Sequence, residues 1–288
     1  MAGARVLDLT SPNGDTLSQT AFCDFQRFLH EHSGITLGDG KRYLVQSRLS
    51  QILPETGLGS LDALIEALVR GQLPEKVRSR IIDVMTTNET FWFRDRGHFE
   101  LLKERLLADL SRQRFRPLRI WSAACSTGQE PYSIAITALE AVREGRLPRA
   151  NLRIVGTDLS QQVLKTAAGT VYSDLSLSRG LPEAIRQRYF QPHANGWRLK
   201  PEVRALVRFQ PFNLLKPCTA LGRFDLIFCR NVLIYFTPET KRDILQRLAA
   251  ALEPGGYLFL SSTETLAEPV AALQPLSLRG TWIYQRPA

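Results

Sequence analysis

From Pro117 onward, short runs rich in β-branched and aromatic residues alternate with helical stretches, and this alternation leaves few folds open to the chain. The strand candidates are residues 118–124, 152–157, 207–211, 224–229, 257–261 and 281–285, and the helix candidates between them are 131–142, 161–168 and 238–252. Strands and helices in alternation form a parallel sheet covered by helices. We therefore expect a doubly wound α/β domain that binds its ligand at the carboxyl ends of the strands.

The region before this domain has the pattern of amphipathic helices. Phe22, Phe25, Phe28 and Leu29 recur at three- and four-residue spacing, and Ser60 is a plausible N-cap for a later helix. The chain therefore divides into three expected segments: an all-α helical domain at 18–85, a linker at 86–116 and the α/β domain at 117–288.

One stretch interrupts the alternation, at about 172–206. It contains a helical run at 182–189 and then Asn195-Gly196, a dipeptide that favours the tight turn of a β-hairpin. We expect a small inserted β-subdomain here.

The net charge limits the classes of binding partner, and the cysteine pattern indicates the cellular compartment. The chain carries 37 Lys and Arg against 28 Asp and Glu, and the excess of +9 falls entirely after residue 85. A positive net charge of this size favours acidic binding partners but does not by itself indicate nucleic acid. The four cysteines show no CxxC or Cys/His spacing, and we expect neither a metal site nor disulfides. Without a long apolar run, a cytoplasmic protein that does not insert into membranes is expected.

The end of the first strand is the first candidate ligand site. Residues 120–131, IWSAACSTGQEP, take an apolar strand into small residues, with Gly128 for a tight turn and Pro131 for the first turn of a helix. The sequence lacks the glycine patterns of dinucleotide and triphosphate sites. An ordinary strand-to-helix turn is the alternative.

The second strand ends at Asp158. An acidic side chain at this position accepts hydrogen bonds from both hydroxyls of a ribose, which suggests a nucleoside cofactor. The alternative role is the N-cap of the next helix, although Ser160 can serve there equally well.

Two further segments combine polar, cationic and aromatic residues: 85–95, MTTNETFWFRD, and 225–236, DLIFCRNVLIYF. Helix caps and packing at a domain boundary explain them as readily as a binding site does.

Six motifs in one consistent order, MTTNETFWFRD, WSAACSTGQEPYSIA, GTDLS, FNLL, FDLIFCRNVLIYF and LEPGGYLFLSSTE, resemble the chemotaxis receptor methyltransferases of the CheR family. The resemblance covers about 22–285. It implies a Rossmann-like methyltransferase domain that uses S-adenosylmethionine, releases S-adenosylhomocysteine, and methylates glutamates on the cytoplasmic helices of chemoreceptors. A regulatory adaptor is possible but unidentified, and no metal is implied.

The resemblance also implies site residues. The expected cofactor contacts are Asn88, Thr90, Arg94, Glu130, Asp158, Asn213, Leu214, Arg230 and Asn231. Arg94 and Tyr235 are the expected catalytic residues, with Tyr235 near the transferred methyl group.

Two alternatives remain open at the level of sequence. A methyltransferase acting on RNA or a small molecule would suit the basic pI, and a non-catalytic module could use the cofactor only as a signal. Residues 41–48, with Lys41, Arg42 and Arg48, offer a basic helix face for an acidic receptor. Cys125 and Cys229 are expected in the core, and His98 is expected as a helix residue rather than a base.

Overall fold

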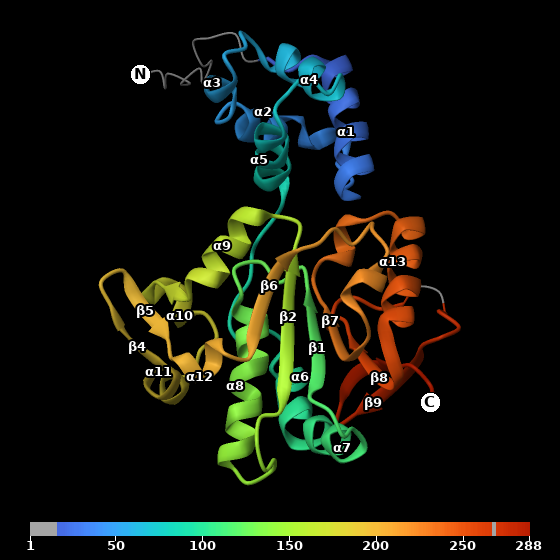
Figure 1. The fold of residues 1–288 in the computed structure, drawn as a ribbon. Coiled ribbons are helices and arrows are strands. Elements are labelled where there is room, and N and C mark those ends of the chain that lie inside the picture. Colours follow the sequence, from blue (N-terminus) through green and yellow to red (C-terminus); the bar gives the residue numbers. More distant parts are fainter. Residues whose placement is uncertain (1–15, 267–268) are drawn as a thin grey trace, which may run out of the picture. The chain divides into compact units, whose positions relative to one another are not determined.

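The computed structural model describes residues 16–266 and 269–288, and the chain forms two compact units (Figure 1). The first comprises Met1–Glu31 and Leu37–Met85, and the second comprises His32–Thr36 and Thr86–Ala288. Among the residues described, no helix combines the length and the apolar character needed to cross a membrane.

The first unit is helical, as expected. Its helices are α1 (Gln19–Ser33), α2 (Arg42–Leu49), α3 (Leu53–Thr56), α4 (Leu61–Val69) and α5 (Glu75–Met85). Phe22 and Phe25 are fully buried, and the Ser60 hydroxyl accepts a hydrogen bond from the Ala63 N–H at 3.2 Å, which confirms the predicted cap. Hydrophobic periodicity and one capping residue thus account for much of this unit.

The expected basic face on residues 41–48 is only partly present. Lys41 ends a short 3₁₀ turn before α2 rather than lying in the helix. Arg48 donates to the Met85 carbonyl at 2.9 Å, at the end of α5, where a cation satisfies a helix carbonyl. The half-buried guanidinium of Arg48 thus joins two helices, and its part in a docking face stays a prediction.

The second unit is built on a seven-stranded sheet in the order β6-β2-β1-β7-β8-β10-β9. The strands are β1 (Leu118–Ala123), β2 (Leu152–Asp158), β6 (Val207–Pro211), β7 (Phe224–Cys229), β8 (Leu252–Phe259), β9 (Gln274–Leu278) and β10 (Thr281–Gln285). The first five in this sheet order pair in parallel, which confirms the doubly wound α/β class.

The carboxyl-terminal edge of the sheet differs from the expectation. β10 pairs antiparallel with both β8 and β9, and β9 was not predicted. Residues Arg279 and Gly280, both with positive φ, connect β9 and β10 in the tight turn that antiparallel pairing allows. β9 has the sequence QPLSL, which lacks β-branched residues and contains a proline tolerated only because the strand is at the edge.

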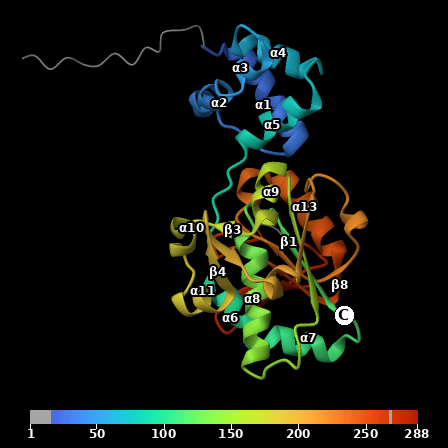
Figure 2. The same ribbon diagram turned by 60° about the vertical axis from the view of Figure 1, so that its left-hand side comes forward.

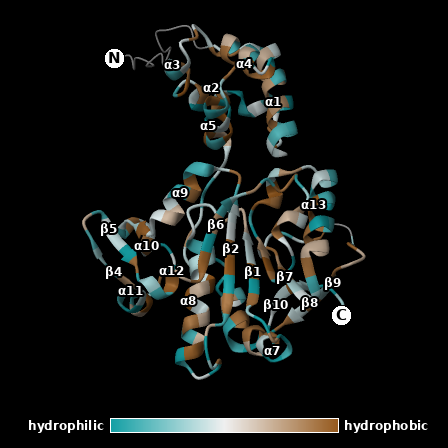
Figure 3. Cartoon of the chain, in the orientation of Figure 1, coloured by the Kyte–Doolittle hydropathy of each residue, from teal (hydrophilic) through white to brown (hydrophobic). Residues whose placement is uncertain are grey.

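Helices cover both faces of the sheet because neighbouring strand residues point to opposite sides. Ile120 and Phe228 belong to a core shared with α6 (Arg96–Leu101), α7 (Leu107–Gln113) and α8 (Gln129–Arg143). Trp121 and Ile227 belong to the other core, which α13 (Pro238–Ala251) completes. Figures 1 and 3 show α8 and α13 on the two sides of the strands, with hydrophobic segments along the central strands.

The small β-subdomain is inserted between α9 (Gln161–Gly169) and β6. Its three-stranded sheet has the order β3-β5-β4, from β3 (Val171–Tyr172), β4 (Phe190–His193) and β5 (Gly196–Leu199). The short helices α10 (Asp174–Ser178), α11 (Glu183–Tyr189) and α12 (Pro201–Arg204) accompany it, and Figures 1 and 2 show the group beside α8. The hairpin predicted at Asn195-Gly196 is confirmed, and Gly196 has φ +121°.

A carboxylate is buried at the start of β7. Asp225 is fully buried and accepts hydrogen bonds from Arg114 (3.1 Å), from Arg116 (2.8 and 3.1 Å) and from the Arg119 N–H (2.9 Å). A buried charge is tolerated only when it is paired in this way. The two arginines therefore attach the chain before β1 to the middle of the sheet.

We expect Asp225→Ala to lower the free energy of unfolding of the second unit by about 3–5 kcal/mol, because it removes the buried carboxylate that two guanidinium groups share. Tryptophan fluorescence during urea denaturation measures this unit, since Trp92, Trp121, Trp197 and Trp282 all lie in it. Asp243→Ala on the exposed side of α13 is the control, with an expected change within about 0.5 kcal/mol. Equal losses in the two variants would contradict the assignment.

Candidate active site

Left-handed backbone conformations gather at the carboxyl ends of β1 and β7, where the strand order reverses. In the described part of the chain, seven non-glycine residues have positive φ, and five of them lie on three segments that meet here: Phe93, Asp95, Ala124, Ser126 and Asn231. Such conformations are costly for residues with a Cβ and concentrate at functional sites. Ligands of doubly wound sheets bind at this point of the topology.

The turn after β1 holds the carboxylate that ends β2. The Ser126 N–H donates to Asp158 Oδ2 at 2.8 Å, and the Ser160 N–H donates to Oδ1 at 3.0 Å. Ser160, not Asp158, caps α9, because its hydroxyl accepts from the Val163 N–H.

The linker joins the same turn. The Ser126 hydroxyl donates to the Asn88 carbonyl at 2.8 Å. One serine therefore connects two of the predicted cofactor contacts, Asn88 and Asp158.

A buried arginine organises the other half of the site. The Arg230 side chain is 1% exposed, and its guanidinium donates to Glu130 (2.7 Å), to the Arg94 carbonyl (2.5 Å) and to Asp95 (2.8 Å). The other Glu130 oxygen accepts from the Ser122 hydroxyl at 2.7 Å. The Arg230 guanidinium thus positions Glu130 and the linker from within the protein.

Protonation in this network follows from burial and the Arg230 charge. Burial alone would raise the pKa of Asp95, but the hydrogen bond and charge of Arg230 outweigh it and hold that pKa below its ordinary value. Burial lowers the pKa of His98 to about 4, and the Arg230 charge adds to the effect. His98 lies in α6 and is neutral at pH 7, which agrees with its expected role as a helix residue.

The cysteines behave as core residues. Cys125 and Cys229 are buried, and burial raises the pKa of both thiols well above the ordinary value. They are therefore not nucleophiles at neutral pH.

Glu264 was missing from the sequence-based site. Its Oε2 accepts from the N–H groups of Asn231 (2.7 Å) and Ser261 (3.2 Å), and its Oε1 accepts from the Leu233 N–H (2.9 Å). The buried carboxylate therefore fixes the turn that carries Asn231 and Tyr235. Its sequence signal is its place as the last residue of the motif LEPGGYLFLSSTE, from which no site residue was predicted.

The remaining predicted residues lie around this framework. The Phe212 N–H donates to the Asp158 carbonyl at 3.0 Å, which brings Asn213 and buried Leu214 beside the end of β2. The Asn213 side chain donates to the His32 carbonyl at 2.7 Å and accepts from the Leu215 N–H at 2.9 Å.

Tyr235 and the linker residues complete the set. The Tyr235 carbonyl accepts from the Thr36 N–H at 3.0 Å. Thr90 and Arg94 lie on the linker, where the Arg94 guanidinium carbon is 5.2 Å from the centre of the Phe91 ring.

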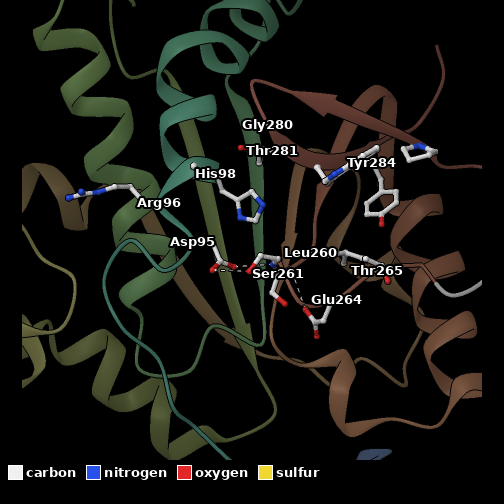
Figure 4. Close-up of a pocket in the computed structure, with 14 residues that line it drawn as sticks. Asp95, Arg96, His98, Leu260, Ser261, Glu264, Thr265, Gly280, Thr281 and Tyr284 are labelled. Atoms are coloured by element: carbon white, nitrogen blue, oxygen red, sulfur yellow. Dashed lines mark hydrogen bonds between the residues drawn. The ribbon is translucent and has the colours of Figure 1, made fainter.

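A cavity of about 540 Å³ adjoins the network (Figure 4). Asp95 and Glu264 contribute to its wall, together with His98 from α6 and with Trp282 and Tyr284 from β10. The two carboxylates that fix the site's loops therefore also line this cavity.

A doubly wound sheet whose second strand ends in a held carboxylate, beside a strained turn, defines the class of α/β proteins that bind a nucleoside cofactor. The family model described as the CheR methyltransferase SAM binding domain matches residues 88–280, and the model of the CheR methyltransferase all-alpha domain matches residues 20–86. The chain belongs to the CheR methyltransferase family.

Relatives agree over nearly the whole length. A chemotaxis protein methyltransferase 1 of Pseudomonas aeruginosa is 48% identical, with 84% of this chain and 89% of that protein covered. Chemotaxis protein methyltransferases of Vibrio anguillarum (45% identical; 87% and 91% covered) and Escherichia coli (36% identical; 93% and 91% covered) are also similar. The chain is a methyltransferase that uses S-adenosylmethionine.

The residues present fit this cofactor. Two oriented carboxylates, Asp158 and Glu130, suit hydroxyl and ammonium groups, and Arg94 supplies a fork of donors for a carboxylate. The left-handed turn at Ala124 and Ser126 follows β1 at the same edge of the sheet.

We expect Glu264→Gln to lower kcat/KM for methyl transfer roughly 10- to 100-fold, because an amide NH₂ replaces an acceptor that faces backbone N–H groups and the Tyr235 turn shifts. Methyl transfer is measured alongside thermal unfolding, which must show a folded protein. Glu239→Gln, exposed in the first turn of α13, is the matched control. Activity equal to that of the control would refute the positioning role.

Stability is expected to fall between pH 6.5 and pH 4. The unfolded chain binds a proton at His98 near its ordinary pKa of 6.5, whereas the folded chain does so only near 4. Within this window the unfolded state holds more protons, so the free energy of unfolding decreases as the pH falls, by on the order of 3 kcal/mol. His98→Leu should flatten this dependence in urea denaturation at pH 7, 6 and 5. An unchanged slope would show that other groups cause it.

Proposed function

We propose that the chain methylates glutamate side chains on the cytoplasmic helices of chemoreceptors, producing glutamate methyl esters and S-adenosylhomocysteine during chemotactic adaptation. The observation that carries this proposal is the 36–48% identity to chemotaxis protein methyltransferases over more than four fifths of the chain. Because those receptor helices are cytoplasmic, we also propose a cytoplasmic location.

Binding of the cofactor is assigned to residues at the edge of the sheet. Asp158 accepts hydrogen bonds from the ribose hydroxyls, with Glu130, Asn213, Leu214 and Asn231 completing the pocket. Asn88, Thr90 and Arg94 contribute from the linker. Arg230 keeps the Glu130 carboxylate aligned through its 2.7 Å bond.

Methyl transfer to a carboxylate requires little acid–base catalysis by the protein. When bound, S-adenosylmethionine supplies an electrophilic methyl group on a cationic sulfur. A glutamate carboxylate, with a reference pKa of about 4.3, is already ionised at neutral pH and attacks that methyl without a general base. Alignment of the two reactants can be worth about 7–11 kcal/mol.

Two side chains do the aligning in this proposal. Arg94 binds a carboxylate through its planar fork of donors. Tyr235 presents its ring to the cationic sulfur, an attraction of about 0.5–2 kcal/mol.

The test is transfer of radiolabelled methyl from S-adenosylmethionine to membranes that contain the cell's own chemoreceptors, measured as methanol released by alkali. We expect alkali-labile label on the receptors, a loss of at least about tenfold in cofactor affinity for Asp158→Ala, and a loss of about 2- to 30-fold in kcat for Tyr235→Leu. Asp243→Ala serves as the control.

Two outcomes would redirect the assignment. Label on RNA instead of receptor would make the chain a nucleic-acid methyltransferase. Cofactor binding without transfer to any receptor would make it a non-catalytic binding module.

A further inference from the structure

Two arginines from distant parts of the chain share one aromatic ring at the edge of the site. The guanidinium carbons of Arg94 and Arg179 lie 5.2 and 5.5 Å from the centre of the Phe91 ring. Arg94 and Phe91 belong to the linker, whereas Arg179 follows α10 in the inserted subdomain. A ring face attracts cations, so both guanidinium groups lie within about 6 Å of the centre of the same ring.

The backbone of Arg179 is fixed independently of its side chain. The Trp92 N–H donates to the Arg179 carbonyl at 3.1 Å, and Gly180, with φ +88°, lies so close that a Cβ there would be 2.1 Å from the Trp92 oxygen. Trp92 is fully buried, with the rings of Tyr172 and Phe190 at 4.9 and 5.3 Å. The Arg179 guanidinium is thus not needed to attach the subdomain to the linker.

The charges of the cluster are exposed and only partly balanced. Arg179 donates to Glu89 at 2.7 Å, with the two side chains 48% and 66% exposed. The hydrogen bond and charge of Arg179 hold the pKa of Glu89 below its ordinary value, and the Arg94 charge contributes. Exposed ion pairs are weak in water, so another carboxylate can replace Glu89 at little cost.

We propose that Arg179 is a specificity-determining residue that binds an acidic side chain of the receptor helix one turn from the glutamate being methylated. Side chains three or four residues apart on a helix lie on the same face, so two acidic side chains of one helix can face two cations held at one ring. Glu89 occupies the Arg179 guanidinium until the substrate's acidic side chain displaces it. This inference rests on the proposed function, because it requires a helical glutamate substrate.

The test compares two variants that break the same ion pair. With a purified chemoreceptor cytoplasmic fragment as substrate, Arg179→Gln should raise KM about tenfold and leave kcat and cofactor affinity within about twofold. Glu89→Gln should lower KM about two- to threefold, because it removes the internal competitor. If the Arg179–Glu89 ion pair only stabilised the structure, both variants would raise KM together. That result, or an unchanged KM in both variants, would overturn the proposal.

Two control variants of the enzyme and one variant of the receptor make the test more specific. Arg186 lies over Trp197 at 4.6 Å and pairs with Glu183 at 2.8 Å within the same subdomain, so Arg186→Gln and Glu183→Gln should leave KM unchanged. Replacing the receptor's acidic residue one turn from the mapped methylation site by glutamine should abolish the effect of Arg179→Gln, as a double-mutant cycle requires; a persisting effect would reject this contact. Absence of any receptor methylation by the wild-type chain would instead reject the proposed function.

Discussion

The edge of the sheet that carries the candidate site depends on the burial of one positive charge. Arg230 is 1% exposed and has two carboxylates and a carbonyl around its guanidinium. A charge inside a protein must be compensated at hydrogen-bond distance, and removal of one partner is far more costly than loss of a surface pair. Glu130 at the start of α8 and Asp95 in the linker are therefore held in one geometry. The segments around this edge are consequently held in place by hydrogen bonds within the chain.

β7 has such a charge near each end. Asp225 near its start is surrounded by Arg114 and Arg116, and Arg230 follows its last residue. All six strand residues between Phe224 and Cys229 are buried. A slip of one residue would place an uncompensated charge in the core and reverse every apolar side chain, so the two charges determine the register of the central strand.

Local sequence patterns predicted what depends on neighbours in the chain. Helix periodicity, the Ser60 cap and the Asn195-Gly196 turn are short-range signals and were correct. β9 was missed because an edge strand containing proline and serine has no such signal. The site behaves differently, since the bonds that build it join residues far apart: Ser126 and Asp158 are separated by 32 residues, Asn231 and Glu264 by 33, and Asp95 and Arg230 by 135. The end of a strand can place Asp158, but no local pattern identifies Glu264 as the residue that holds Asn231.

The linker is part of the sheet domain rather than a tether. Its Asn88 carbonyl is bonded to the turn after β1, its Arg94 carbonyl to Arg230 after β7, and its Trp92 N–H to the inserted subdomain. Three attachments within seven residues remove most of the conformational freedom of this segment. The positive φ angles of Phe93 and Asp95 are maintained by these attachments, because an unconstrained chain would relax them. The part of the chain that begins at Pro117 therefore contains the sheet but lacks one wall of the site, and the methyltransferase unit must begin at the linker for that wall to be complete.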